Sequence, residues 1–136
     1  MDTAYSAPIS NPLNWTNNGS VLPRHLQYSN LAITGGFIYL FGGQEINNAS
    51  NVIFRAPTSN PLAWTDTGGR LPSGVYKSAF GQVNGNFMIF GGQLFPDTPS
   101  NLIWSAPVGS PLNWQVTGAL PYPAAMGKFI NIGGDG

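Results

Sequence analysis

The feature that most constrains the fold of this chain is a repeat with a period of about fifty residues. The stretch NPLNW at Asn11–Trp15 returns as NPLAW at Asn60–Trp64 and as SPLNW at Ser110–Trp114, so the tryptophans are 49 and 50 residues apart. The surrounding frames SAPISNPLNWT, RAPTSNPLAWT and SAPVGSPLNWQ repeat as well. A chain of 136 residues with this period is built from copies of one supersecondary unit.

Each complete period contains three short apolar runs before its tryptophan, and this pattern predicts antiparallel strands. The runs are rich in β-branched and aromatic residues and are bounded by glycine, proline and asparagine, as strands are. They cover 30–34, 37–41 and 51–57 in the first complete period, and 79–83, 86–90 and 101–107 in the second. With a fourth strand at the tryptophan, each period is predicted to form a four-stranded antiparallel sheet with little helix.

Gly-Gly pairs and one Asn-Gly pair occur at two kinds of position in these units. Gly35-Gly36, Asn84-Gly85 and Gly133-Gly134 accept positive φ at two successive residues, which a two-residue hairpin turn requires. The double glycines Gly42-Gly43 and Gly91-Gly92 follow the second apolar run, and we expect them to end that strand.

The repeated proline predicts a turn before the fourth strand of each unit. Proline fixes its own φ and pushes the preceding residue, such as Asn60, into an extended conformation. The leucine and tryptophan that follow are two residues apart, so both side chains would project from one face of a strand. We therefore expect Trp15, Trp64 and Trp114 to pack between sheets in three equivalent contacts.

These units resemble the blades of kelch-type β-propellers, which carry four strands, a double glycine after the second strand and a tryptophan in the fourth. The resemblance rests on FIYLFGG, NFMIFGG and the three tryptophans, and it covers nearly the whole chain. It implies an all-β fold, a partial β-propeller of four-stranded antiparallel blades, with about 2.5 to 3 blades in this chain. In one departure, the tyrosine expected in the third strand is Tyr5 in the first unit but Phe54 and Trp104 in the others.

Alignment of the units by their tryptophans divides the chain into a half blade at 1–28, blades at 29–77 and 78–126, and a single strand at 127–136. The half blade holds the third and fourth strands of its unit. About three blades fall short of the four to eight that close a ring. The chain is therefore predicted to be either part of a longer propeller or a protomer that completes a ring with other copies, as a homo-oligomer.

The amino-acid composition excludes several classes of partner and cofactor. Charged residues make up only 7% of the chain and the formal net charge is zero, so nucleic acid is not an expected partner. The chain has no cysteine and a single histidine, so we expect no metal site and no cofactor. No signal peptide and no long apolar window is visible, so membrane insertion is not expected.

The connections of such units fall into two groups. The hairpin turns and the proline turns lie on one side and are nearly identical, whereas the other connections lie on the opposite side and differ in sequence. Because binding residues commonly sit on loops that a rigid frame holds, the variable side is the candidate binding face. Its candidate residues are Arg24, His25, Tyr28, Glu45, Tyr76, Lys77, Phe95, Asp97 and Tyr122.

Each of these residues also has a simpler interpretation. The single histidine is more easily explained as a solvated loop residue than as a base or ligand. Arg24 with Glu45, or Lys77 with Asp97, could form ordinary surface ion pairs worth under about 1 kcal/mol. The three tyrosines could stack on a sugar or fill the gaps between blades, and we favour the second role.

The sequence leaves three functions open. The first is a non-enzymatic recognition module that presents variable loops to a protein or glycan, in an extracellular or virion-associated setting. The second is a sugar-processing or oxidase-type enzyme, because propellers similar to kelch repeats include such catalysts; no catalytic residue is assigned. The third is a structural protomer that assembles through exposed sheet edges.

Overall fold

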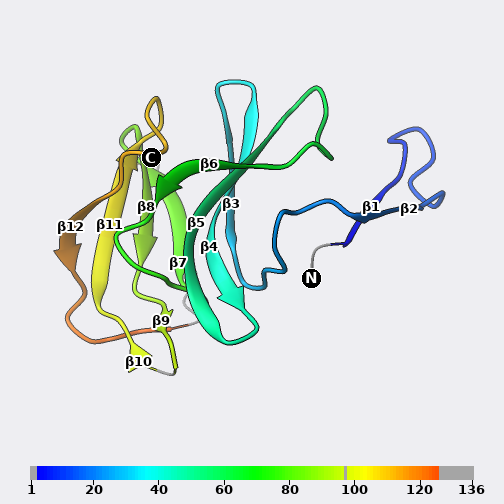
Figure 1. Cartoon of the computed structure of the whole chain (residues 1–136). Coiled ribbons are helices and arrows are strands. Elements are labelled where there is room, and N and C mark those ends of the chain that lie inside the picture. The colour runs from blue at the N-terminus through cyan, green and yellow to red at the C-terminus, as the bar shows by residue number, and fades with distance from the viewer. Residues whose placement is uncertain (1–2, 97, 126–136) are drawn as a thin grey trace.

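A computed structural model describes residues 3–96 and 98–125, and every regular element in these residues is a β-strand. The predicted all-β class is therefore confirmed. Most strands belong to two antiparallel four-stranded sheets, and two smaller two-stranded sheets complete the set (Figure 1). The predicted strand at 127–136 and the turn at Gly133-Gly134 lie outside the described residues.

The first large sheet contains β3 (Asn30–Thr34), β4 (Phe37–Glu45), β5 (Asn48–Pro57) and β6 (Thr65–Arg70). These strands are neighbours in chain order, and each pair is antiparallel. The predicted four-strand unit is confirmed here. We call this the β3–β6 sheet.

The second large sheet repeats this arrangement with β7 (Ala79–Val83), β8 (Asn86–Phe90), β11 (Leu102–Pro107) and β12 (Gln115–Ala119). We call it the β7–β12 sheet. A small hairpin of β9 (Gln93–Leu94) and β10 (Thr98–Pro99) lies between its second and third strands in the chain. The separate pair of β1 (Thr3–Ser6) and β2 (Thr16–Ser20) corresponds to the third and fourth strands expected in the first unit.

The hairpin turns have the predicted backbone conformation. Gly35 and Gly36 have φ values of 58° and 80°, and Asn84 and Gly85 have φ values of 50° and 78°. Two successive positive φ values match the right-handed twist of the flanking strands. The short-range signal in the sequence was therefore sufficient to place these two turns.

The double glycines behave differently in the two sheets. In the β7–β12 sheet the second strand ends at Phe90, directly before Gly91-Gly92, as expected. In the β3–β6 sheet the prediction is wrong, because β4 continues to Glu45 through a bulge between Phe41 and Gly43. Only two residues, Ile46 and Asn47, then connect β4 to β5, so the connection is a tight hairpin.

The double glycines hold the segment that crosses from one sheet to the next. We call 21–29, 71–78 and 120–125 the crossing segments. The amide of Gly43 donates a hydrogen bond to the carbonyl of Val75 at 2.9 Å, and the amide of Gly92 donates to the carbonyl of Ala124 at 2.7 Å. The two bonds are equivalent by the repeat, so the same contact fixes the exit from each large sheet.

The next residue of a crossing segment binds the following sheet. Val75 is held by the β3–β6 sheet, because its amide also donates to the carbonyl of Ser50 at 3.2 Å. Its neighbour Tyr76 exchanges two backbone hydrogen bonds, of 3.1 and 2.7 Å, with Gln93, which follows β8 of the other large sheet. Two adjacent residues, Val75 and Tyr76, therefore bind to two consecutive sheets.

The three proline turns are confirmed. Each has the same pair of backbone hydrogen bonds, and in each the amide of the residue before the tryptophan donates to the residue before the proline, at 3.0 to 3.1 Å. The leucine and tryptophan, however, precede the fourth strands, which begin at Thr16, Thr65 and Gln115. The prediction that both side chains project from a strand is wrong, because strand pairing starts only after the tryptophan.

The main core lies between the two large sheets. Phe37, Tyr39 and Phe41 alternate along β4 and face the β7–β12 sheet, while Leu40 faces the opposite side. Phe41 is the centre of an aromatic group and contacts the rings of Tyr39, Phe80, Phe87 and Trp114 at centroid distances of 5.1 to 6.1 Å. The buried members of this core are Ala32, Tyr39, Phe41, Ile53, Leu71, Val75, Phe87, Ile89, Trp104, Ala106 and Trp114.

The tryptophans do not make three equivalent contacts. Trp114 is buried as expected, stands edge-on to Phe41 at 5.1 Å, and donates its indole N–H to the carbonyl of Pro111 at 2.8 Å. Trp64 is partly buried against Leu26, Val52 and Phe54. Trp15 is 62% exposed, so the prediction that it packs between sheets is wrong.

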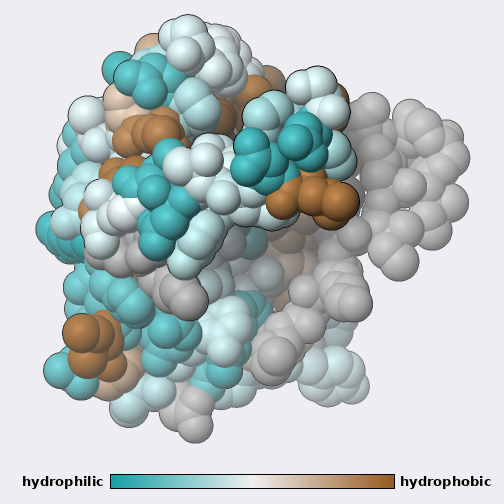
Figure 2. All heavy atoms as spheres, turned by 90° about the vertical axis from the view of Figure 1, so that its right-hand side faces the viewer, coloured by the Kyte–Doolittle hydropathy of each residue, from teal (hydrophilic) through white to brown (hydrophobic). Residues whose placement is uncertain are grey.

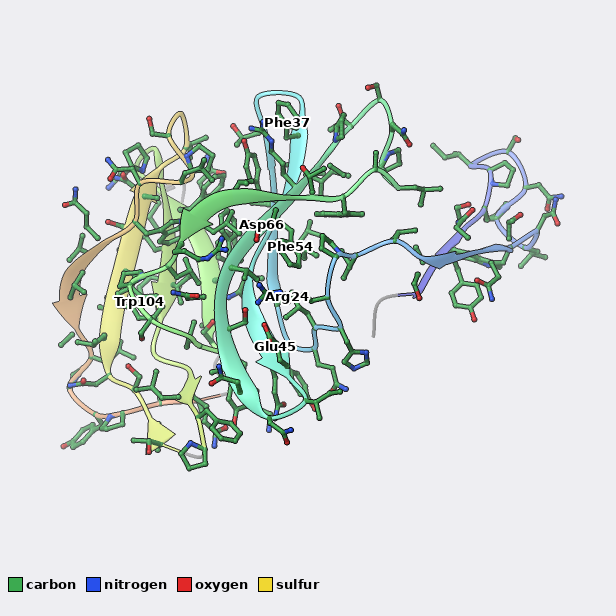
Figure 3. The ribbon with its side chains drawn as sticks, viewed as in Figure 1. Arg24, Phe37, Glu45, Phe54, Asp66 and Trp104 are labelled. Atoms are coloured by element: carbon green, nitrogen blue, oxygen red, sulfur yellow. The ribbon has the colours of Figure 1, made fainter. Side chains whose placement is uncertain are left out.

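The reason lies in the position of the β1–β2 pair. Figure 1 shows it at one side of the molecule, connected to the large sheets through the crossing segment 21–29. Within the described part of the chain, no other strand pairs with it. Tyr5 on β1 is also 59% exposed, whereas the equivalent Phe54 and Trp104 are buried in the large sheets (Figure 3). A tryptophan in the repeated position is buried only where a neighbouring sheet packs on it.

Gly42→Ala is expected to destabilise the fold more than Gly35→Ala. The two glycines have similar φ values, 61° and 58°, so the cost of a left-handed alanine, about 1–2 kcal/mol, is common to both. A Cβ at Gly42 would lie 2.9 Å from the Val75 carbonyl and 3.1 Å from that of Ser50, whereas nothing lies within 4 Å of one at Gly35. Urea unfolding of both variants measures the difference, and equal losses would contradict the proposed role of the crossing segment.

Trp114→Ala is expected to reduce the free energy of unfolding by about 3–5 kcal/mol, because it leaves a cavity against Phe41. Trp15→Ala is the matched change in an exposed copy of the same turn, and we expect an effect within about 0.5 kcal/mol. Equilibrium denaturation followed by the remaining tryptophan fluorescence measures both. Similar losses in the two variants would show that the β1–β2 pair packs on the rest of the molecule.

Candidate functional site

The variable connections gather at one end of the sheets. In Figure 1 the crossing segments, the β4–β5 hairpin and the β9–β10 hairpin lie at the lower end, and the Gly35-Gly36 turn and the proline turns of the large sheets lie at the upper end. The grouping of connections predicted from antiparallel order therefore agrees with the structure. We call the lower end the loop end.

Arg24, His25 and Glu45 come together at the loop end. Arg24 Nη1 lies 3.0 Å from Glu45 Oε1, and Figure 3 shows both residues at the lower end of the β3–β6 sheet. All three border a pocket of about 330 Å³, whose wall is completed by Ile46, Asn47 and Asn48. Residues that are about twenty apart in sequence thus form one polar site.

A second hollow of about 250 Å³ adjoins this pocket. His25, Glu45 and Ile46 border both, and Gln27 and Gln44 line only the second. The side-chain nitrogens His25 Nε2 and Gln27 Nε2 are 3.4 Å apart. The two hollows together present a guanidinium, an imidazole, a carboxylate and amides, a set that can donate and accept hydrogen bonds.

The backbone explains why these side chains meet. Gln27 and Gln44 exchange two backbone hydrogen bonds, of 3.0 and 2.7 Å, which fix the crossing segment 21–29 on the end of β4. This contact places Arg24 and His25 beside Glu45, the last residue of β4. Gln93 occupies the equivalent position in the second sheet, so the repeated sequence Gly-Gly-Gln was a signal for this contact that the sequence reasoning missed.

Tyr28, Tyr76 and Lys77 form a second group. The ammonium of Lys77 lies 5.1 Å from the ring centroid of Tyr28 and 5.7 Å from that of Tyr76, which are distances at which a cation and an aromatic face attract. Tyr28 is 52% exposed, whereas Tyr76 is buried and its hydroxyl donates to the carbonyl of Pro96 at 3.4 Å. Phe95, which precedes that proline, is 44% exposed. The side chain of Tyr76 is therefore buried, whereas the ring of Tyr28 is about half exposed.

The backbone at Tyr28 and Lys77 is strained. These equivalent residues, 49 apart in sequence, have φ values of 57° and 55°. A left-handed conformation at a residue other than glycine costs of order 1–3 kcal/mol and recurs at functional sites. The hydrogen-bonded pairs Gln27–Gln44 and Tyr76–Gln93 directly precede them and hold the chain in this shape.

Two predicted residues fall outside these groups. Tyr122 is 80% exposed on the crossing segment 120–125, and it lines neither of the hollows around Arg24. Asp97 lies outside the described residues, and so does its predicted pair with Lys77. The residues Gln27, Gln44, Ile46, Asn47 and Asn48, which line the hollows, were not predicted.

One nearby carboxylate has a perturbed pKa. Two hydrogen bonds from Arg70, of 2.8 and 3.0 Å, lower the pKa of Asp66 on β6, and one from the Gly68 amide adds to this effect. The charge of Arg24 acts in the same direction. Arg24 therefore forms an ion pair with Glu45 on β4 and also lies within electrostatic reach of Asp66 on β6.

Neither a metal-binding cluster nor a membrane-spanning helix is found among the described residues. The described residues contain no group of three or more histidine, cysteine, aspartate or glutamate side chains that could hold a metal ion. Within the same ranges, no helix is long and apolar enough to cross a membrane. Comparison of the sequence with protein-family models gives no match, and neither does comparison with curated proteins.

Proposed function

We propose that this chain is a non-enzymatic recognition module that binds a protein or glycan at the loop end. The observation that carries the proposal is the convergence of Arg24, His25 and Glu45 on one pocket. Gln27 lines the adjoining hollow and directly precedes Tyr28, whose ring is open to solvent. An exposed aromatic ring close to charged and amide groups suits sugars as well as protein loops.

The fold we propose for this module is a partial kelch-like propeller. Three features support it: four-stranded antiparallel units repeat, one large sheet packs its face on the next, and equivalent hydrogen bonds hold both exits. Fold alone does not determine function, so the recognition role rests on the loop end. An extracellular or virion-associated setting fits the low charge of the chain.

The recognition role predicts that binding is lost at the loop end and kept at the opposite end. We expect Arg24→Ser and Tyr28→Asn each to weaken binding to a glycan identified on an array by about tenfold, since each removes a contact worth roughly 1–2 kcal/mol. Asparagine is chosen at position 28 because it tolerates positive φ better than most residues. The measurement is the dissociation constant of each variant for that glycan.

The control for this prediction is Ser59→Ala, an exposed change at the proline-turn end, which should bind normally. Position 73 in the next crossing segment is equivalent to position 24, and it is a serine. Arg24→Ser therefore introduces a residue that the same kind of segment already contains. Unchanged binding in both loop-end variants would reject this face as the binding surface.

One observation favours a second role, assembly with further sheets. Leu31 and Ile33 on β3 are 53% and 64% exposed. By the repeat, Leu31 corresponds to Phe80, which packs on Phe41 of the preceding sheet at a centroid distance of 5.8 Å. We propose that a further sheet, from another copy or another part of a longer chain, covers this face.

Exposed apolar residues also lie on the β1–β2 side, where Figure 2 shows separate brown patches among polar surface. The most exposed apolar side chains near the first proline turn are Ile9 at 99% and Leu13 at 89%. Apolar side chains that are exposed singly are common on protein surfaces and do not by themselves mark an interaction site. Ile9 and Leu13 lie outside the β3–β6 sheet, so they are not part of the face that we propose to be covered.

Assembly through β3 predicts a mass above that of one chain. Light scattering should give a higher mass for the wild type, and the double change Leu31→Asp and Ile33→Asp should return it to that of one chain, because buried carboxylates would be unpaired. Leu13→Asp, outside the β3–β6 sheet, is the control and should leave the mass unchanged. A wild type that remains a single chain at high concentration would reject self-assembly.

A further inference from the structure

A third pocket lies away from the loop end, and the proposed function does not involve it. It has a volume of about 470 Å³ and is formed by both large sheets. Tyr39 and Arg55 come from paired positions on β4 and β5, and the proline turn at 109–113 comes from the other sheet. Figure 3 shows Phe37, which contacts Arg55, at the end of the β3–β6 sheet opposite Arg24 and Glu45.

The guanidinium of Arg55 lies over the aromatic ring of Phe37. Its guanidinium carbon lies 4.2 Å from the ring centroid of Phe37. The ion pairs found between described residues are Arg24–Glu45 and Arg70–Asp66, and neither includes Arg55. A guanidinium stacked on an aromatic face keeps its N–H groups available at its edge, where they match the two oxygens of a carboxylate.

Three residues with neutral polar side chains border the same pocket: Tyr39, Ser110 and Asn113. Two backbone hydrogen bonds close the turn, because the Ser110 amide donates to the carbonyl of Pro107 at 2.9 Å and the Asn113 amide donates to that of Ser110 at 3.0 Å. The indole of Trp114 further fixes the turn by donating to the Pro111 carbonyl at 2.8 Å. The polar side chains of the turn therefore stand on a rigid support.

We propose that this pocket binds an acidic monosaccharide unit, with Arg55 contacting its carboxylate. The hydroxyl and amide groups of Tyr39, Ser110 and Asn113 would contact sugar hydroxyls, and Pro111 and Leu112 supply an apolar wall for the C–H face. The volume is within the range of small-molecule sites. A flexible acidic peptide side chain would use the arginine but not the hydroxyl-binding groups, so the pocket fits the sugar better.

The repeat supplies a matched variant. Position 55 corresponds to Ser105 in the β7–β12 sheet, so serine is already accepted at this place in the same kind of strand. Arg55→Ser therefore removes the guanidinium with little risk to the fold. Arg55→Lys keeps the charge but removes the two-pronged geometry, and it serves as a second variant should the first fail to fold.

The experiment is a titration of the isotope-labelled protein with galacturonate and with galactose, followed by NMR. We expect saturable shifts at the amides of Gly109, Ser110, Leu112 and Asn113 with galacturonate. Binding of galactose should be weaker by about tenfold, because galactose lacks the carboxylate that Arg55 would contact. Arg55→Ser should weaken galacturonate binding by a similar factor, Arg55→Lys by less, and Asn113→Ala only modestly. Ser59→Ala, an exposed change in the corresponding turn of the β3–β6 sheet that borders none of the three pockets, should bind normally.

Several results would overturn the proposal. These are the absence of saturable shifts with galacturonate at millimolar concentration, equal binding of galactose, or unchanged binding by Arg55→Ser. Tighter binding of a capped glutamate than of galacturonate would assign the pocket to acidic peptides instead. Because Arg24→Ser tests the loop end separately, failure here is distinguishable from failure of the proposed recognition role.

Discussion

The structure depends on one backbone contact, in which neighbouring residues of a crossing segment bind consecutive sheets. Val75 is held by Gly43 and Ser50 of the sheet behind it, and Tyr76 pairs with Gln93 of the sheet ahead. The contact requires a glycine where the chain passes, because a Cβ at Gly42 would meet the carbonyls of Val75 and Ser50. Burial of the aromatic core around Phe41 follows, since the sheets are held at the distance that their side chains fill.

The same contact produces the candidate site. The pairs that fix the crossing segments directly precede Tyr28 and Lys77, and they hold both residues in the left-handed region. The exposed side chains of these segments are then presented by a backbone that cannot easily move. Preorganisation of this kind reduces the entropy lost on binding.

Prediction from sequence succeeded where local chemistry decides the structure. The turns at Gly35-Gly36 and Asn84-Gly85 follow from residues that tolerate positive φ, and the strands follow from apolar runs between them. Prediction failed where the local structure depends on contacts with other parts of the chain. Trp15 and Trp114 occupy equivalent turns, yet only Trp114 has a sheet against it, and the bulge that extends β4 depends on a crossing segment about thirty residues away. The pockets were not predictable because their walls come from separate strands.

The three crossing segments share a frame but differ at the residue after Leu-Pro, which is Arg24, Ser73 or Tyr122. Among the described residues, none of the backbone bonds that join the large sheets involves this position. Chemical identity can therefore change there from cation to hydroxyl to aromatic ring while the architecture is preserved. Such a separation of roles lets new binding preferences arise by single substitutions at little cost to folding.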